Sequence, residues 1–113
     1  MLKIYNNPRC SKSRGCLAFL ETLGQPFELV KYMENPLSEN EVRRLIDQLN
    51  IAPIELVRRK ESLWIEHYKH KDLSADEIIT ILANHPVLIE RPIVTNGNKA
   101  VIARPIENVA NIV

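Results

Sequence analysis

The chain has no apolar run long enough to cross a membrane. Its longest uninterrupted apolar stretches, such as Ala100 to Ala103, fall far short of the roughly 18 residues that a membrane-spanning helix needs. Residues 1–10 also lack the apolar stretch of a signal peptide. We therefore expect a cytoplasmic protein with no membrane partner.

The chain has almost equal numbers of positive and negative residues, and it contains little glycine. Fifteen Lys and Arg against 14 Asp and Glu give a net charge of +1, whereas non-specific binding to nucleic acid needs a cationic excess. With 3 glycines, the chain contains no glycine-rich nucleotide-binding pattern. Its 113 residues, 45% of them hydrophobic, are typical of a single globular domain. We expect one domain over residues 1–113, with no nucleic-acid partner and no bound cofactor.

Cysteine is almost absent. Cys10 and Cys16 are six residues apart at the start of a predicted helix, which separates them by about 9 Å along the helix axis. A disulfide tolerates about 7 Å between Cα atoms, so we expect both thiols to be reduced. The third residue after Cys10 is Ser13, which excludes a C-x-x-C mechanism. A redox cycle at Cys10 would therefore need an external thiol.

Alternating apolar and polar residues predict strands at both ends of the chain. The predicted strands are 2–5, 27–32, 93–95 and 99–103. A helix from Ser11 to about Gly24 joins the first two, and Asn96-Gly97-Asn98 gives the last two a hairpin signal. A helix that begins at Pro105 would close the chain. The two ends therefore have the orders βαβ and ββα.

The middle of the chain is predicted to be helical. Ser38 and Ser74 each have a glutamate three residues later, which is the capping-box pattern, and Pro53 is suited to begin a short helix. Without this block, the order is βαβ followed by ββα, the layout of a thioredoxin-like domain. We predict an α/β, thioredoxin-like fold (βαβ…ββα) with a helical block inserted over about residues 38–84, between the second and third strands.

Cys10 is a candidate nucleophile. It follows the first strand and immediately precedes the first helix, where free N–H groups and the helix dipole favour a thiolate. Arg9, Lys12 and Arg14 surround it and could form a receptacle for an oxyanion or a thiolate. A buried structural cysteine with solvated basic neighbours is the alternative. Cys16 falls in the apolar stripe of the helix, which favours a place in the core over a resolving role.

Two arginine-proline pairs flank the predicted hairpin. A residue before proline is restricted to extended geometry, which fixes the direction of Arg91-Pro92 and Arg104-Pro105. If the hairpin lies beside the first strand, both guanidinium groups could reach Cys10 and hold an oxyanion. The alternative is a pair of exposed or salt-bridged arginines. His67 and His70 have the spacing of metal ligands but no third ligand nearby, so we predict no metal site.

Several motifs together closely resemble the glutaredoxin-coupled arsenate reductases of the ArsC family. These motifs are I-Y-N-N-P-R-C-S-K-S-R (4–14), Y-M-E-N-P (32–36), E-L-V-R-R-K-E (55–61), H-P (85–86), E-R-P-I-V (90–94) and A-R-P (103–105). They are spread over nearly the whole chain. The resemblance implies a thioredoxin-like enzyme with a helical insertion that reduces arsenate to arsenite.

The resemblance also implies roles for particular residues. Cys10 would attack arsenate, and Arg58, Arg91 and Arg104 would hold the anion. Pro92 would be the cis-proline that faces the nucleophile. Glutathione, as co-substrate, would add to the arsenic, and glutaredoxin would resolve the adduct with release of arsenite.

Position 6 departs from the family pattern. Related enzymes often carry a histidine there, which helps to lower the pKa of the cysteine, whereas Asn6 can form hydrogen bonds but cannot be cationic. Activation of the thiol would then depend on the helix terminus and the arginines, with Asn6 and Ser13 as supporting residues. Arg58 is preferred to Arg59 from the register of the motif, on the assumption that both lie on a helix.

Two other functions remain open from the sequence. One is a monothiol glutathione-dependent oxidoreductase of unknown substrate. The other is a redox-responsive regulator resembling the Spx-type proteins, which bind RNA polymerase. Those proteins typically carry a C-x-x-C switch, and Ser13 stands where its second cysteine would be.

Overall fold

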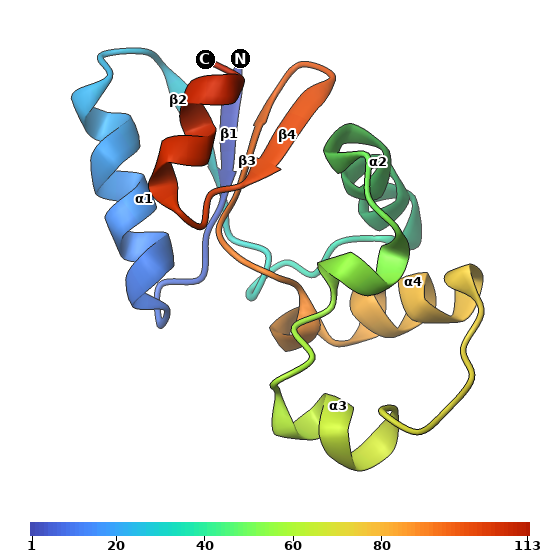
Figure 1. Cartoon of the computed structure of the whole chain (residues 1–113). Coiled ribbons are helices and arrows are strands. Elements are labelled where there is room, and N and C mark those ends of the chain that lie inside the picture. The colour runs from blue at the N-terminus through green and yellow to red at the C-terminus, as the bar shows by residue number, and fades with distance from the viewer. The chain divides into compact units, whose positions relative to one another are not determined.

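In the computed structural model, which describes residues 1–113, the two ends of the chain form one four-stranded sheet (Figure 1). The elements of this part are β1 (Leu2–Tyr5), α1 (Ser11–Thr22), β2 (Phe27–Val30), β3 (Ile93–Asn96), β4 (Lys99–Ile102) and the 3-10 helix η3 (Ile106–Asn111). The strand order is β2-β1-β3-β4, with β1 parallel to β2 and antiparallel to β3. This arrangement confirms the predicted βαβ and ββα orders and the thioredoxin-like layout.

One face of the sheet carries the core of this part of the molecule. Ile4 of β1 and Val94 of β3 pack with Leu20 of α1 and Val109 of η3, and all four are fully buried. Successive side chains of a strand point to opposite faces, so Lys3 between two buried residues is exposed. Helices α1 and η3 therefore cover the same face of the sheet (Figure 1).

Two predicted elements of this part differ from the structure. Strand β2 ends at Val30 because the chain turns next, where the Glu34 N–H donates to the Lys31 carbonyl. The segment after Pro105 is a 3-10 helix of 6 residues. Its asparagines and β-branched residues are poor α-helix formers.

The middle of the chain forms a second compact unit, Asn35–Glu90, and the first unit consists of Met1–Glu34 and Arg91–Val113. The elements of the second unit are α2 (Glu39–Leu49), the 3-10 helix η1 (Pro53–Leu56), α3 (Ser62–His67), α4 (Ala75–Asn84) and the 3-10 helix η2 (Pro86–Leu88). The second unit is longer at both ends than the predicted insertion of residues 38–84. That the whole chain is one domain stays a prediction.

Capping boxes begin the two longest helices of the second unit. The Ser38 and Ser74 side chains each accept a hydrogen bond from the backbone N–H three residues later, at the start of α2 and α4. Both boxes confirm the sequence prediction, and α2 and α4 pack against each other. No helix of the chain combines the length and the apolar character that crossing a bilayer requires.

Candidate active site

Cys10 lies at the N-terminal end of α1, where the sequence predicts it. It is the N-cap residue, in extended conformation, and its carbonyl accepts the Arg14 N–H at 3.1 Å. A turn after β1 fixes its position, because the Cys10 N–H donates to the Asn7 carbonyl at 2.9 Å. The thiol is partly exposed and not in a disulfide. Cys10 is therefore held by its backbone while its side chain is accessible.

Two arginines from the hairpin lie at this thiol. Arg104 Nη2 donates a hydrogen bond to Cys10 Sγ at 3.9 Å. The Arg91 side chain, which is 9% exposed, also donates a hydrogen bond to Cys10. The expected cis peptide bond before Pro92 is present, and the Arg104-Pro105 bond is cis as well.

The sheet register explains why these arginines meet. Tyr5, the last residue of β1, pairs with Ile93, the first residue of β3. Ile93 in turn pairs with Ile102, the last residue of β4. The end of β1, the start of β3 and the end of β4 therefore lie at one edge of the sheet, and Cys10, Arg91 and Arg104 all leave from that edge.

The surroundings of Cys10 make its thiol acidic. Burial favours the neutral thiol, but hydrogen bonds from the Ser13 N–H, the Arg91 side chain, the Lys12 N–H and the Ser13 hydroxyl outweigh it. Together they lower the pKa of Cys10 from 9.0 to about 7. Roughly half of the molecules then carry a thiolate at neutral pH. The first-turn N–H groups act as the sequence predicts.

The basic residues next to Cys10 in the sequence are arranged differently from the prediction. Arg14 Nη1 donates to the Pro8 carbonyl at 2.9 Å, and the Arg9 and Lys12 side chains are exposed. Successive side chains on a helix point about 100° apart, so neighbours in the sequence cannot all face one thiol. Only the backbone N–H of Lys12 donates to Cys10. The cationic groups at Cys10 come from the hairpin instead.

The other predicted residues of this unit are buried. Ser13 is fully buried and supplies both a backbone and a side-chain donor to Cys10. Asn6 is 5% exposed, its backbone N–H bonds to Val30, and its side-chain oxygen has no hydrogen-bond partner. Cys16 is fully buried, and burial raises the pKa of its thiol to about 11. Its predicted place in the core is confirmed.

Arg58 belongs to the second unit, and its predicted position on a helix is wrong. Helix η1 ends at Leu56, and Val57 is extended and forms an antiparallel bridge with Ile89. The Arg58 N–H then donates to the Leu88 carbonyl at 2.7 Å. Pairing with the segment around Ile89 thus pulls the chain out of the helix before Arg58. The role of Arg58 in holding an anion stays a prediction.

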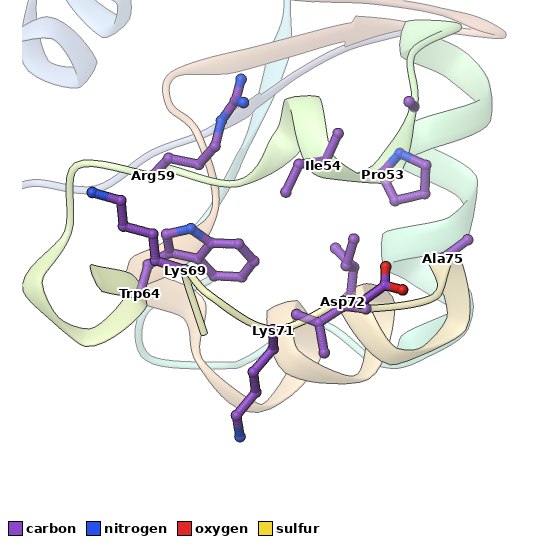
Figure 2. Close-up of a pocket in the computed structure, with 11 residues that line it drawn as sticks. Pro53, Ile54, Arg59, Trp64, Lys69, Lys71, Asp72 and Ala75 are labelled. Atoms are coloured by element: carbon purple, nitrogen blue, oxygen red, sulfur yellow. The ribbon is translucent and has the colours of Figure 1, made fainter. Parts of the chain in front are cut away.

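Arg58 and Arg59 have different surroundings within the second unit. Arg58 Nη1 lies 3.3 Å from Glu61 Oε1, and the Arg58 side chain is half-buried. Arg59 lines a cavity of about 530 Å³ that sequence reasoning did not find (Figure 2). Trp64 and Ile54 form apolar walls of this cavity, and Figure 2 shows the guanidinium group of Arg59 pointing away from its centre.

The fold and the site together define a class of protein. It is a thioredoxin-like protein with a single acidic cysteine at the start of its first helix, faced by two arginines that follow from the ends of a hairpin. The model of the ArsC family matches residues 5–112. The chain therefore belongs to the ArsC family.

Proteins and structures from several bacteria are similar to this chain over nearly its whole length. A Neisseria meningitidis protein named arsenate reductase is 39% identical over 110 residues, which are 96% of this chain and 94% of that protein. The uncharacterised protein YfgD of Escherichia coli is 42% identical over 114 residues, 99% of this chain and 96% of that protein. The solved structure of an arsenate reductase from Vibrio cholerae has a TM-score of 0.94 and 41% identity, covering 99% of this chain and 97% of that one.

Proposed function

We propose that this protein reduces arsenate to arsenite with Cys10 as the nucleophile. The observation that carries the proposal is the position of Arg91 and Arg104 at a thiol whose pKa is about 7. The relatives from Neisseria meningitidis and Vibrio cholerae support it, because both are named arsenate reductase. The substrate would be arsenate or a similar tetrahedral oxyanion.

The arginines would bind the anion and orient it. Guanidinium groups match the oxygens of a tetrahedral oxyanion in paired hydrogen bonds, which lysine cannot do. Arg91 is buried, so its side chain has a fixed direction. Arg104 is exposed and already contacts Cys10 Sγ, so an incoming anion would share its N–H groups with the sulfur.

The first step is a substitution at arsenic. The Cys10 thiolate forms a bond to arsenic, and one arsenate oxygen takes up protons and leaves as water, while arsenic stays at oxidation state five. A pKa of about 7 provides the thiolate near neutral pH without a separate base. The positive arginines also reduce the repulsion between the thiolate and the anion.

Reduction needs thiols from outside the chain, because no second cysteine can reach Cys10. Cys16 is buried in the core. Glutathione would displace a second oxygen from arsenic, again as water. A glutaredoxin thiol would then attack the glutathione sulfur to form a mixed disulfide, which leaves two electrons on arsenic. Hydrolysis of the remaining sulfur–arsenic bond would release arsenite and return Cys10 as a thiol.

A coupled assay tests this proposal. The protein is incubated with arsenate, glutathione, glutaredoxin, glutathione reductase and NADPH, and NADPH consumption is followed. We expect consumption that depends on arsenate and disappears in the Cys10→Ser variant. Equal consumption by the wild type and by that variant would dispose of arsenate reduction at Cys10.

The same thiol supports a second candidate, a glutathione-dependent oxidoreductase. The observation that favours it is the acidity of Cys10 with no adjacent cysteine, since a thiol of pKa near ambient pH is well suited to attack disulfides. Turnover of a mixed disulfide with glutathione, in a preparation that does not reduce arsenate, would establish this function instead.

A further inference from the structure

The cavity of about 530 Å³ in the second unit has no part in the chemistry proposed for Cys10 (Figure 2). Its volume lies in the range of pockets that hold small organic ligands. All of its lining residues fall between Ala52 and Ile78, so they belong to the second unit. A molecule bound there would therefore be recognised by the helical unit alone.

Apolar side chains from three helices line this cavity. They include Pro53 and Ile54 of η1, Trp64 of α3 and Ile78 of α4. Pro53 and Ile54 are only partly buried, so an apolar ligand would remove further apolar surface from water. The indole of Trp64 pairs favourably with another aromatic ring in an offset or edge-to-face arrangement. The walls therefore favour a ligand with an apolar, ring-bearing body.

The charged residues of the lining narrow the class of ligand further. Cations exceed carboxylates by three to one among them, since they are Arg59, Lys69, Lys71 and Asp72. Lys71 Nζ already lies over the Tyr68 ring, 5.6 Å from its centroid. Arg59 and Lys69 are exposed, and neither forms an ion pair within the protein. Two cations without a counter-charge favour a ligand that carries a negative group.

Lys69 is held next to Trp64 by its backbone. The Lys69 N–H donates to the Trp64 carbonyl at 2.9 Å, just after α3 ends at His67. In Figure 2, Arg59 lies at the same end of the cavity as Trp64 and Lys69, and Pro53 lies at the other end. Exposed lysine side chains change rotamer rapidly, so the ammonium group of Lys69 can turn toward a bound anion. The aromatic wall and the two cations thus belong to one end of the cavity.

We propose that this cavity binds a small aromatic carboxylate, with its ring against Trp64 and its negative group toward Lys69 and Arg59. A carboxylate has two oxygens and can accept hydrogen bonds from both cations at once. The site is separate from the chemistry at Cys10, so it does not depend on arsenate reduction.

The fluorescence of Trp64 reports binding directly, because it is the only tryptophan of the chain. The probe is 4-phenylbutyrate. Its matched controls have the same ring and carbon chain, and they are the uncharged 4-phenyl-1-butanol and the cationic 4-phenylbutylamine. We expect a saturable change in Trp64 emission with 4-phenylbutyrate, with a Kd about fivefold lower than that of the alcohol, because the anion gains exposed ion pairs. The amine should bind more weakly than the alcohol.

Two variants separate the charge from the apolar wall. Lys69→Glu should raise the Kd of 4-phenylbutyrate about fivefold and leave the Kd of 4-phenyl-1-butanol unchanged, because only the anion interacts with the altered charge. Ile54→Ala should raise the Kd of both compounds by a similar factor, about threefold, because it removes apolar wall. The matched control is Lys99→Glu, which makes the same change of charge at an exposed residue of the first unit and should leave every Kd unchanged.

Several results would overturn the proposal. Equal binding of the acid, the alcohol and the amine would remove the role of the cations, and so would equal effects of Lys69→Glu and Lys99→Glu. The absence of saturable binding of 4-phenylbutyrate, by fluorescence and by calorimetry, would remove the site itself. Tighter binding of the peptide acetyl-Glu-Phe-Glu-amide than of 4-phenylbutyrate would replace the small molecule by a segment of a partner protein. None of these measurements involves arsenate or Cys10, so failure of arsenate reduction leaves their outcome unaffected.

Discussion

The acidity of Cys10 gives a quantitative prediction for its reactivity. With a pKa of about 7 instead of 9.0, the thiolate fraction at pH 7 rises from roughly 1% to roughly 50%. The intrinsic nucleophilicity of a thiolate falls with its pKa, and a shift of about two units costs roughly tenfold. Cys10 should therefore react about fivefold faster at pH 7 than an otherwise equal thiol of pKa 9.0, and this advantage should vanish at about pH 8 and reverse above it.

Removal of the Arg91 side chain tests the cause of this shift. Arg91 is the largest side-chain contributor to the lowered pKa of Cys10, and the Ser13 hydroxyl is a smaller one. Arg91→Ala should raise the pKa of Cys10 toward 9.0, and Ser13→Ala should raise it less, because the Ser13 N–H remains. The first-turn N–H groups persist in both variants, so neither should reach the full value of a free thiol.

The assay is the rate of alkylation by iodoacetamide as a function of pH. Cys10→Ser provides the baseline, and ultraviolet absorbance of the thiolate provides an independent titration. The wild-type profile should have its midpoint near pH 7. A wild-type midpoint at or above that of a free cysteine, about 8.5, would refute the argument that hydrogen bonds outweigh burial. If Arg91→Ala leaves the midpoint unchanged, the pKa shift of Cys10 is not caused by the guanidinium group of Arg91.

Three further predictions concern the core, the second cysteine and the second unit. Leu20→Ala should lower the free energy of unfolding by about 2 to 5 kcal/mol in urea titrations, because Leu20 is fully buried; a loss under about 1 kcal/mol would contradict the packing described. Burial and a pKa of about 11 should leave Cys16 unreactive, so a thiol reagent at pH 8 should count one thiol in the native protein and two in denaturant. Arg58→Ala should raise the KM for arsenate about tenfold or more, the range for hydrogen bonds to charged groups, whereas Arg59→Ala should leave this KM unchanged. A larger increase of the KM in Arg59→Ala than in Arg58→Ala would show that Arg58 does not bind the anion.

Local sequence signals account for most of the fold. The serine-glutamate pairs at Ser38 and Ser74 predicted the starts of α2 and α4, because a capping box is complete within four residues. The hairpin turn was predictable for the same reason, since Gly97 takes a positive φ of 62° that few other residues adopt. The prediction failed where pairing between segments far apart in the sequence decides the local structure. The bridge between Val57 and Ile89 ends the helix before Arg58, and nothing near Arg58 in the sequence signals it.

The same distinction between local and long-range signals holds for the candidate site. The position of Cys10 at a helix start is a local property and was predicted. Whether Arg91 and Arg104 approach Cys10 depended on the pairing of the hairpin with β1. The sequence alone could not decide this pairing. The register of β1 with β3 fulfils it. A cavity of about 550 Å³ beside the Cys10 turn was not predicted, because most of its lining comes from the motifs at 4–14 and 32–36, which are brought together only by the pairing of β1 with β2.

The structure gives Asn6 a different place from the one that the family pattern suggests. A histidine at this position was expected to assist the cysteine, yet the groups that lower the pKa of Cys10 are Ser13, Arg91 and Lys12. Asn6 is not among them, so the thiol becomes acidic without a cation at position 6. Asn6 is buried, and its side-chain oxygen has no hydrogen-bond partner within the protein. Activation of the sulfur is thereby assigned to residues other than Asn6, so a change at position 6 should leave the acidity of Cys10 in place.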